Sequence, residues 1–262
     1  MRVCFFSLLL GYSLLVAAQE DQFQFTSTSE PFTERNFFRL GNRVLTLARH
    51  GYEDNKPFVL VSLHNNEHTA IQTGLNYVQQ NGGVFYELVN NQERYVAFEL
   101  MNQRYLFDPN RIFTYKGREE NLKMFKSWDK RTHDQVLQFA QFILNEIPFR
   151  KTIVALHNNT DAAYDINAYK EGGEYERETR AVHTNPDMDK DDFFLTSDEG
   201  VYEKLKERNY NVVLQHNQKV KDDGSLSVYC AKVNRKYINI ETEFGHTGVQ
   251  EEMLDVLEKV LK

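Results

Sequence analysis

Cysteine is almost absent from this sequence. The chain of 262 residues has two cysteines, Cys4 and Cys230. Cys4 lies in an apolar N-terminal segment, so the rest of the chain holds one thiol and cannot form an internal disulfide. The fold must therefore be stabilised by its hydrophobic core. Cys230 lies in the apolar run Val228–Ala231, which indicates a buried, inert thiol rather than a nucleophile.

Runs of basic residues are also missing. The chain has 31 Lys and Arg against 38 Asp and Glu, a formal net charge of −7 and a pI near 5.7. No Lys- or Arg-rich segment offers a surface for nucleic acid or for anionic lipid. Hydrophobic residues make up 41% and charged residues 26% of the chain, which is typical of one globular domain.

Long hydrophobic runs are confined to the N-terminus. Arg2 precedes the largely apolar run Phe5–Leu15, and the small residues Val16, Ala17 and Ala18 follow. This pattern predicts a signal peptide cut after Ala18, because the run is short for a transmembrane helix. An uncleaved anchor is the alternative. Cleavage removes Arg2 and changes the formal net charge from −7 to −8.

The predicted organisation has three parts. Residues 1–18 are the signal peptide, residues 19–35 are a polar N-terminal lead-in, and residues 36–262 form a single catalytic domain. We therefore expect a secreted or periplasmic protein with no membrane partner after signal removal.

Short apolar runs alternate with longer helical stretches after residue 43. This order predicts an α/β domain with a mixed, mainly parallel central sheet and helices on both faces. The expected strands are Val44–Ala48, Phe58–Leu63, Val84–Val89, Arg94–Leu100, Thr152–Leu156, Asn211–Gln215, Leu226–Val233 and Tyr237–Glu243, with Val84–Val89 and Arg94–Leu100 joined by a turn at Asn90-Asn91. The expected helices are Glu67–Gln80, Asn121–Phe125, His133–Asn145, Glu199–Arg208 and Val249–Leu261.

Two buried strands each end in a histidine. His64 follows the first and His157 follows Thr152–Leu156, while Glu67 stands three residues after His64 at a helix start. Ligands collect at the carboxyl ends of strands in α/β sheets, so these side chains can meet at one cation. Two His and one Glu form the ligand set of a hydrolytic zinc site. Alternatively, His157 is an ordinary hydrogen-bonded residue, or His64 and His68 bind zinc from one helix, although Asn65 and Asn66 disfavour that helix.

Two further segments carry charged residues. The segment Arg104–Phe113 holds Asn110 and Arg111, which suit a substrate carboxylate, although a solvated surface loop is equally consistent. In the late strand, Glu241 and Glu243 share one face, where two carboxylates repel unless a cation or a function compensates. A solvent-facing edge strand is the alternative there.

Four motifs occur in a fixed order along the chain. They are His64-Asn65-Asn66-Glu67, Arg104-Tyr105 ahead of Asp108-Pro109-Asn110-Arg111-Ile112-Phe113, Leu156-His157-Asn158-Asn159-Thr160, and Glu243-Phe244-Gly245. Together they resemble the zinc carboxypeptidase superfamily, and within it most closely the succinylglutamate desuccinylase/aspartoacylase branch. The motifs span residues 58–250 and are specific as a set, although each is short.

The resemblance implies a role for each matched residue. His64, Glu67 and His157 would bind one Zn²⁺ per chain. Glu243, preferred over Glu241 because it fits the Glu-x-Gly motif, would be the general base. Arg104 would face the developing oxyanion, and Asn110 with Arg111 would hold a substrate carboxylate. Asn158-Asn159-Thr160 also fits a glycosylation acceptor pattern, but its place beside His157 indicates a wall of the site.

The implied activity is zinc-dependent hydrolysis of an amide bond near a substrate carboxylate. Pro109 replaces the usual Leu, and the C-terminal β domain of the desuccinylase branch has no counterpart after the late strand. We therefore expect an open cleft and carboxypeptidase-like trimming of extracellular or cell-wall peptides. The first alternative is an N-acyl amino acid deacylase, and the second is a non-catalytic binding module that retains zinc.

Overall fold

The computed structural model describes residues 32–51, 54–160 and 164–262. The predicted signal peptide and most of the predicted lead-in lie outside the described residues. Residues 32–35 of the lead-in belong to a regular strand, β1 (Phe32–Leu40), which pairs antiparallel with β2 (Arg43–Gly51). The lead-in therefore ends earlier than predicted.

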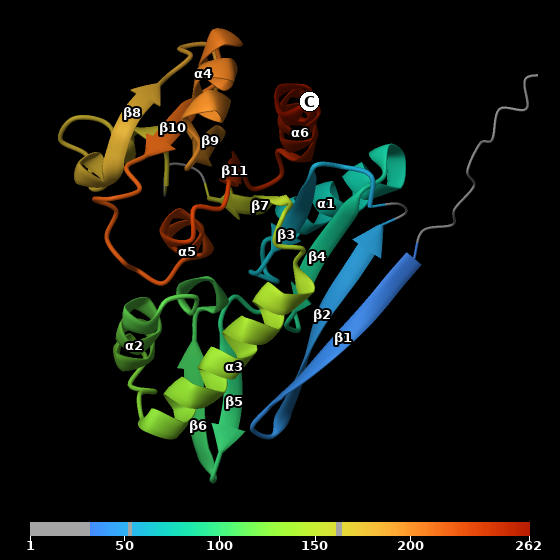
Figure 1. Cartoon of the computed structure of the whole chain (residues 1–262), viewed down its shortest axis with the longest axis vertical. Coiled ribbons are helices and arrows are strands. Elements are labelled where there is room, and N and C mark those ends of the chain that lie inside the picture. Colours follow the sequence, from blue (N-terminus) through green and yellow to red (C-terminus); the bar gives the residue numbers. More distant parts are fainter. Residues whose placement is uncertain (1–31, 52–53, 161–163) are drawn as a thin grey trace, which may run out of the picture.

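The described chain forms a central sheet of nine strands (Figure 1). Their order is β1-β2-β4-β3-β7-β11-β9-β10-β8. The remaining strands of this sheet are β3 (Phe58–Ser62), β4 (Val84–Val89), β7 (Thr152–Asn159), β8 (Thr179–His183), β9 (Phe193–Thr196), β10 (Val212–Gln215) and β11 (Tyr237–Glu243). The four central strands β4, β3, β7 and β11 run parallel, and antiparallel pairs flank them on both sides. The predicted mixed sheet with a parallel centre is confirmed.

Helices cover both faces of this sheet (Figure 1). On one face lie α1 (His68–Asn81), α4 (Glu199–Glu207) and α6 (Thr247–Leu261), which share one hydrophobic core with the sheet. On the other face lie α2 (Tyr115–Met124), α3 (Lys130–Glu146) and α5 (Leu226–Lys232), together with the hairpin β5 (Val96–Leu100) and β6 (Gln103–Phe107). This arrangement, with helices on both faces of one mixed sheet, is the α/β architecture that the sequence predicts.

Strand β3 has apolar residues at four consecutive positions, Phe58 to Val61, rather than at alternate ones. Val59 and Val61 pack into the core under α3, while Phe58 and Leu60 pack into the core under α1 and α6. All five residues of the strand are buried. A strand covered on both faces needs apolar residues at every position rather than at alternate ones. The strand therefore lies at the centre of the molecule and holds the residue after it in a fixed place.

Two predicted features are wrong. Leu226–Val233, predicted as a strand, is the helix α5, which begins after Ser225 because the Ser225 hydroxyl accepts a hydrogen bond from Val228 N. The strands before and after the turn at Asn90-Asn91 do not pair as a hairpin, because β4 lies between β2 and β3 while β5 pairs with β6. Both errors have the same cause: a local pattern does not say which neighbour an element packs against.

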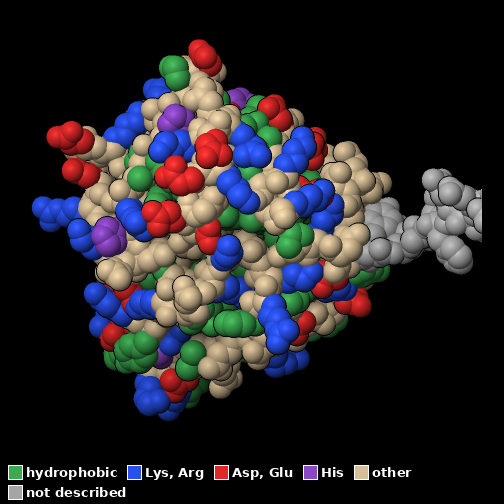
Figure 2. Space-filling model, turned by 45° about the horizontal axis from the view of Figure 1, so that its top comes forward, with side chains coloured by type: hydrophobic (Ala, Val, Ile, Leu, Met, Phe, Trp, Pro, Cys, Tyr) green, Lys and Arg blue, Asp and Glu red, His purple; other side chains and the backbone are tan. Residues whose placement is uncertain are grey.

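The surface carries charges of both signs. On the face shown in Figure 2, Lys and Arg side chains are interspersed with Asp and Glu. Among the described helices, none has the length and apolar composition needed to span a bilayer.

Candidate metal centre and the adjoining cavity

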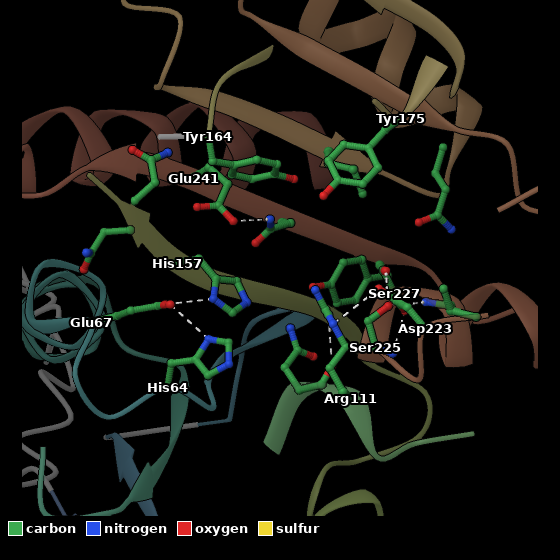
Figure 3. Close-up of a pocket in the computed structure, with 18 of the residues that line it drawn as sticks. His64, Glu67, Arg111, His157, Tyr164, Tyr175, Asp223, Ser225, Ser227 and Glu241 are labelled. Atoms are coloured by element: carbon green, nitrogen blue, oxygen red, sulfur yellow. Dashed lines mark hydrogen bonds and ion pairs between the residues drawn. The ribbon is translucent and has the colours of Figure 1, made fainter. Parts of the chain in front are cut away.

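The residues after β3 and β7 meet at one point. These strands are parallel neighbours, with Val61 opposite Ala155, so their carboxyl ends bring His64 and His157 together. The two imidazole rings lie 5.2 Å apart between centroids, and Glu67 reaches between them from the start of α1 (Figure 3). Each of the three side chains offers a ligand atom, and these atoms all lie within 4.8 Å of one another.

The donor atoms are arranged as a metal site requires. His64 Nδ1 lies 2.9 Å from one Glu67 oxygen and His157 Nδ1 lies 2.8 Å from the other. His64 is 2% exposed, His157 is 7% exposed and Glu67 is 3% exposed. His64 Nδ1 makes no hydrogen bond of acceptable geometry. Two imidazole nitrogens and a carboxylate, buried and converging, are the ligands that Zn²⁺ prefers in hydrolytic sites. The residues fit a zinc ion.

Asp108 fixes the orientation of the first histidine. His64 Nε2 lies 2.8 Å from Asp108 Oδ1, so a hydrogen on Nε2 is donated to this carboxylate and the Nδ1 lone pair faces the site. A carboxylate behind a metal-binding imidazole has this effect on its tautomer. His68 is exposed, and His64 precedes the helix rather than lying in it, so the alternative with both ligands on one helix is wrong.

The site stabilises positive charge. Burial alone would lower the pKa of His64, but the carboxylates of Glu67 and Asp108 raise it to about 9. Burial alone would raise the pKa of Glu67, but the two imidazoles hold it well below its usual range. The same balance with His64 lowers the pKa of Asp108 to about 2. Imidazoles and carboxylates that share protons in this way can bind a metal cation in place of those protons.

Arg94, rather than Arg104, is the arginine at this centre. Arg94 Nη1 lies 2.7 Å from Glu67 Oε1, and the side chain lines the cavity beside the histidines. Arg104 is exposed on β6 and is not among the residues that line the cavity, so the expected position of Arg104 is wrong. The physical reason is topology: Arg94 follows β4, whose carboxyl end lies at the same sheet edge as that of β3, whereas β6 belongs to a separate hairpin.

Asn65 holds the segment that carries Arg94. Its Oδ1 accepts hydrogen bonds from Asn90 N at 2.8 Å and Gln92 N at 2.9 Å, and its Nδ2 donates to Glu87 Oε1 at 2.8 Å. Asn65 is 7% exposed. The sequence gives no indication of this role, because the hydrogen-bond partners lie 25 and 27 residues away along the chain.

Asn110 and Arg111 both line the cavity, where the sequence places them. They lie in a short 3₁₀ turn, Pro109–Arg111. Asp108 caps the start of this turn, and its Oδ1 accepts a hydrogen bond from Asn110 N. Asn110 Oδ1 accepts from Leu226 N at 3.1 Å, which ties the turn to α5. Arg111 Nε lies 3.4 Å from Asp223 Oδ2, so its charge is already partly paired.

The late strand presents Glu241 to the cavity rather than Glu243. Glu241 stands directly opposite His157 in the parallel pairing of β11 with β7, is 8% exposed and lines the cavity. Glu243 lies two residues further, about 7 Å along the strand, where its carboxylate is 3.6 Å from His246 and its side chain is 27% exposed. Burial raises the pKa of Glu241, and the negative charge of Glu67 adds to the effect of burial against the opposing charge of His157.

The cavity beside the triad has a volume of about 580 Å³, within the range of small-molecule sites. Asn158, Asn159 and Thr160 line it, as the sequence predicts. Tyr164, Tyr169 and Tyr175, which sequence reasoning did not single out among fourteen tyrosines, form its aromatic wall. Cys230 does not line this cavity and is fully buried, as predicted, and burial raises its pKa to about 12.

No family model and no curated protein matches this sequence. Among solved structures, the chain is similar to an aspartoacylase family protein from Mesorhizobium loti, with a TM-score of 0.50, 14% identity, and coverage of 90% of this chain and 68% of that one. It is also similar to a succinylglutamate desuccinylase/aspartoacylase from Rhodobacter sphaeroides (TM-score 0.48, 9% identity, 88% and 65% coverage) and to a candidate metallopeptidase from Shewanella baltica (0.45, 11%, 88% and 87%). The Mesorhizobium protein is named for the aspartoacylase family, whose branch the sequence motifs resemble. At such identities the Mesorhizobium likeness shows the fold alone.

Proposed function

We propose that this chain is a zinc-dependent hydrolase that cleaves an amide bond next to a substrate carboxylate, as a carboxypeptidase does. The observation that carries the proposal is the buried group His64, Glu67 and His157, whose ligand atoms converge within 4.8 Å at one end of a cavity. The substrates we propose are extracellular or cell-wall peptides, which follows from the predicted signal peptide.

The residues around the cavity divide the chemistry among them. Zinc held by the triad would supply a Lewis acid that polarises the substrate carbonyl. Glu241 would take a proton from the attacking water on its carboxylate and return that proton to the leaving amine. Arg94 would stabilise the negative charge that develops on the carbonyl oxygen. Arg111 and Asn110 would bind the substrate carboxylate and so fix the scissile bond.

Deacylation of N-acyl amino acids is the second candidate, because it needs the same groups. The two reactions differ in what occupies the acyl side of the scissile bond. Phe244 lines the cavity, follows the end of β11 directly and is 58% exposed. An exposed aromatic side chain next to β11, the strand that carries Glu241, offers a contact to a further residue of a peptide substrate. This favours a peptide over a short acyl group.

The test compares two glutamine variants of one strand. Zinc-loaded wild type, Glu241→Gln and Glu243→Gln are assayed by mass spectrometry on N-acylated dipeptides and on N-acetyl and N-succinyl amino acids. We expect Glu241→Gln to retain zinc and lose about 10²–10⁴ in kcat, while Glu243→Gln keeps most of its activity.

Three outcomes would contradict parts of this proposal. Loss of activity in Glu243→Gln with an active Glu241→Gln would reverse the assignment of the base. Cleavage of acylated amino acids alone would establish the deacylase. Retained zinc with no hydrolysis of any substrate would favour the non-catalytic binding module.

A further inference from the structure

The cavity extends well beyond the metal centre. It passes from His157 on β7 across Glu241 and Asn239 on β11 and Leu195 on β9 to Gln215 on β10. Three strand spacings separate β7 from β10, which is about 14 Å. We define the far subsite as the part of the cavity lined by Asn239, Gln215, Glu178 and Tyr175. Asn239 lies at its near edge, beside Glu241, and Gln215 lies three strands away from His157.

Asn239 leaves an unsatisfied acceptor in this subsite. Its Nδ2 donates to Glu241 Oε1 at 3.0 Å, and a carboxylate that accepts this bond fixes the amide so that Oδ1 faces away. Asn239 is 8% exposed, and its Oδ1 has no hydrogen-bond partner among the described residues. A buried acceptor without a partner costs about 1–3 kcal/mol, which a ligand with an N–H donor recovers. This observation indicates a donor-bearing ligand.

Glu178 adds a negative charge at the far end. It lines the cavity, its main-chain oxygen accepts from His216 N just after β10, and its side chain accepts from the main-chain N of Lys221. Within the described part of the chain, no cationic side chain forms an ion pair with it, whereas Arg111 is paired with Asp223. Burial raises the pKa of Glu178, and the nearby charge of Asp223 adds to that effect against the opposing main-chain N–H and charge of Lys221. A bound cation would relieve both costs.

The walls of the subsite are aromatic. The rings of Tyr169 and Tyr175 lie 5.2 Å apart between centroids. Tyr164 packs edge-on against Tyr175 at 6.2 Å, and Figure 3 shows these two side chains at the cavity. Tyrosine faces attract ammonium and guanidinium groups. The aromatic walls, the unpartnered acceptor of Asn239 and the Glu178 carboxylate, which forms no ion pair within the described residues, all suit a cationic ligand that carries N–H donors.

We propose that the far subsite binds a guanidinium or ammonium group of the substrate, so that the residue next to the cleaved amide is basic. This inference rests on the proposed function and specifies its substrate class. The substrate carboxylate meets Arg111, and the basic side chain extends between Tyr175 and Asn239 toward Glu178.

The test uses arginine and citrulline, which have the same length but differ in charge. Calorimetric titration of the zinc-loaded protein measures the binding of each free amino acid without requiring turnover. We expect arginine to bind about tenfold more tightly than citrulline, as a charge-assisted contact requires. Glu178→Gln should bring the two affinities within about twofold, whereas Glu178→Asp, which keeps the charge, should retain most of the preference.

Glu171→Gln is the matched control, because Glu171 is exposed in the same loop region, does not line the cavity and loses the same charge. Equal binding of arginine and citrulline by wild type, no detectable arginine binding, or the same loss in Glu171→Gln would overturn the proposal. A parallel assay with N-acyl-dipeptides ending in arginine or citrulline separates the two claims. Arginine preference in binding without any amide cleavage would contradict the proposed hydrolase alone, while cleavage without arginine preference would contradict the subsite alone.

Discussion

Asp108 determines how well His64 can bind a metal. Its Oδ1 accepts from His64 Nε2 at 2.8 Å, and Asp108 is 7% exposed, so the contact is poorly screened by solvent. We expect Asp108→Asn, which keeps an acceptor oxygen but removes the charge, to weaken zinc binding at least about tenfold. Competition with a zinc-binding dye measures this change. Asp255→Asn, an exposed position of α6, should leave the affinity unaltered, and an unaltered affinity in Asp108→Asn would contradict the role.

Arg94 and Arg104 give a second residue-scale prediction. Arg94 contacts Glu67 beside the triad, whereas Arg104 is exposed on β6. Removal of a group that stabilises a developing oxyanion costs about 10²–10³ in kcat, so we expect this loss in Arg94→Gln with zinc retained. Arg104→Gln should have nearly wild-type kinetics. The opposite result would restore the assignment made from the Arg-Tyr motif.

The candidate site shows which residues a sequence can disclose. His64 and His157 are found because each directly follows an apolar run, and Glu67 because it stands three residues after His64. Their meeting point then follows from the order of the strands. Glu241 and Glu243 share a face in the sequence, and only the pairing with β7 shows which of them stands opposite His157. Arg94 can be identified as a site residue only when β4 is known to lie beside β3, and no local sequence pattern shows that pairing.

At the scale of elements, α2 and the segment before α5 approach each other closely. A methyl group on Gly117 would lie 2.0 Å from Gly224 N and 2.1 Å from Gly224 Cα, which are main-chain atoms. We therefore expect Gly117→Ala to lower the free energy of unfolding by about 1–3 kcal/mol, measured by urea denaturation. In Gly248→Ala, near the start of α6, the new methyl group meets nothing within 4 Å, so stability should be equal or higher. Equal stability of both variants would contradict this packing.

The elements also show where sequence patterns stop being informative. Strand β3 is predicted correctly because an uninterrupted run of four apolar residues, Phe58 to Val61, suits a strand buried on both faces. Helix α5 is seven residues long, too short to display a helical period, and its Val228-Tyr229-Cys230 favours a strand locally. Its N-terminus is set by Ser225 and by the hydrogen bond from Leu226 N to Asn110, a contact across 116 positions of the chain.

For the whole molecule, we propose export with removal of residues 1–18. The apolar run Phe5–Leu15 followed by Val16-Ala17-Ala18 motivates this proposal. Expression of the full chain in a secreting host, followed by N-terminal sequencing of the secreted protein, should give Gln19 as the first residue. Retention of Met1 on a cell-associated protein would support the uncleaved anchor instead.

The central claim is that two strand-end imidazoles and one helix-start carboxylate bind a single zinc ion. Metal analysis of the purified protein by mass spectrometry, after zinc loading and dialysis, tests it most directly. We predict one zinc per chain in wild type and in His68→Ala, and none in His64→Ala with a circular dichroism spectrum that shows the fold intact. A zinc-free wild type, or full zinc content in a folded His64→Ala variant, would contradict the account.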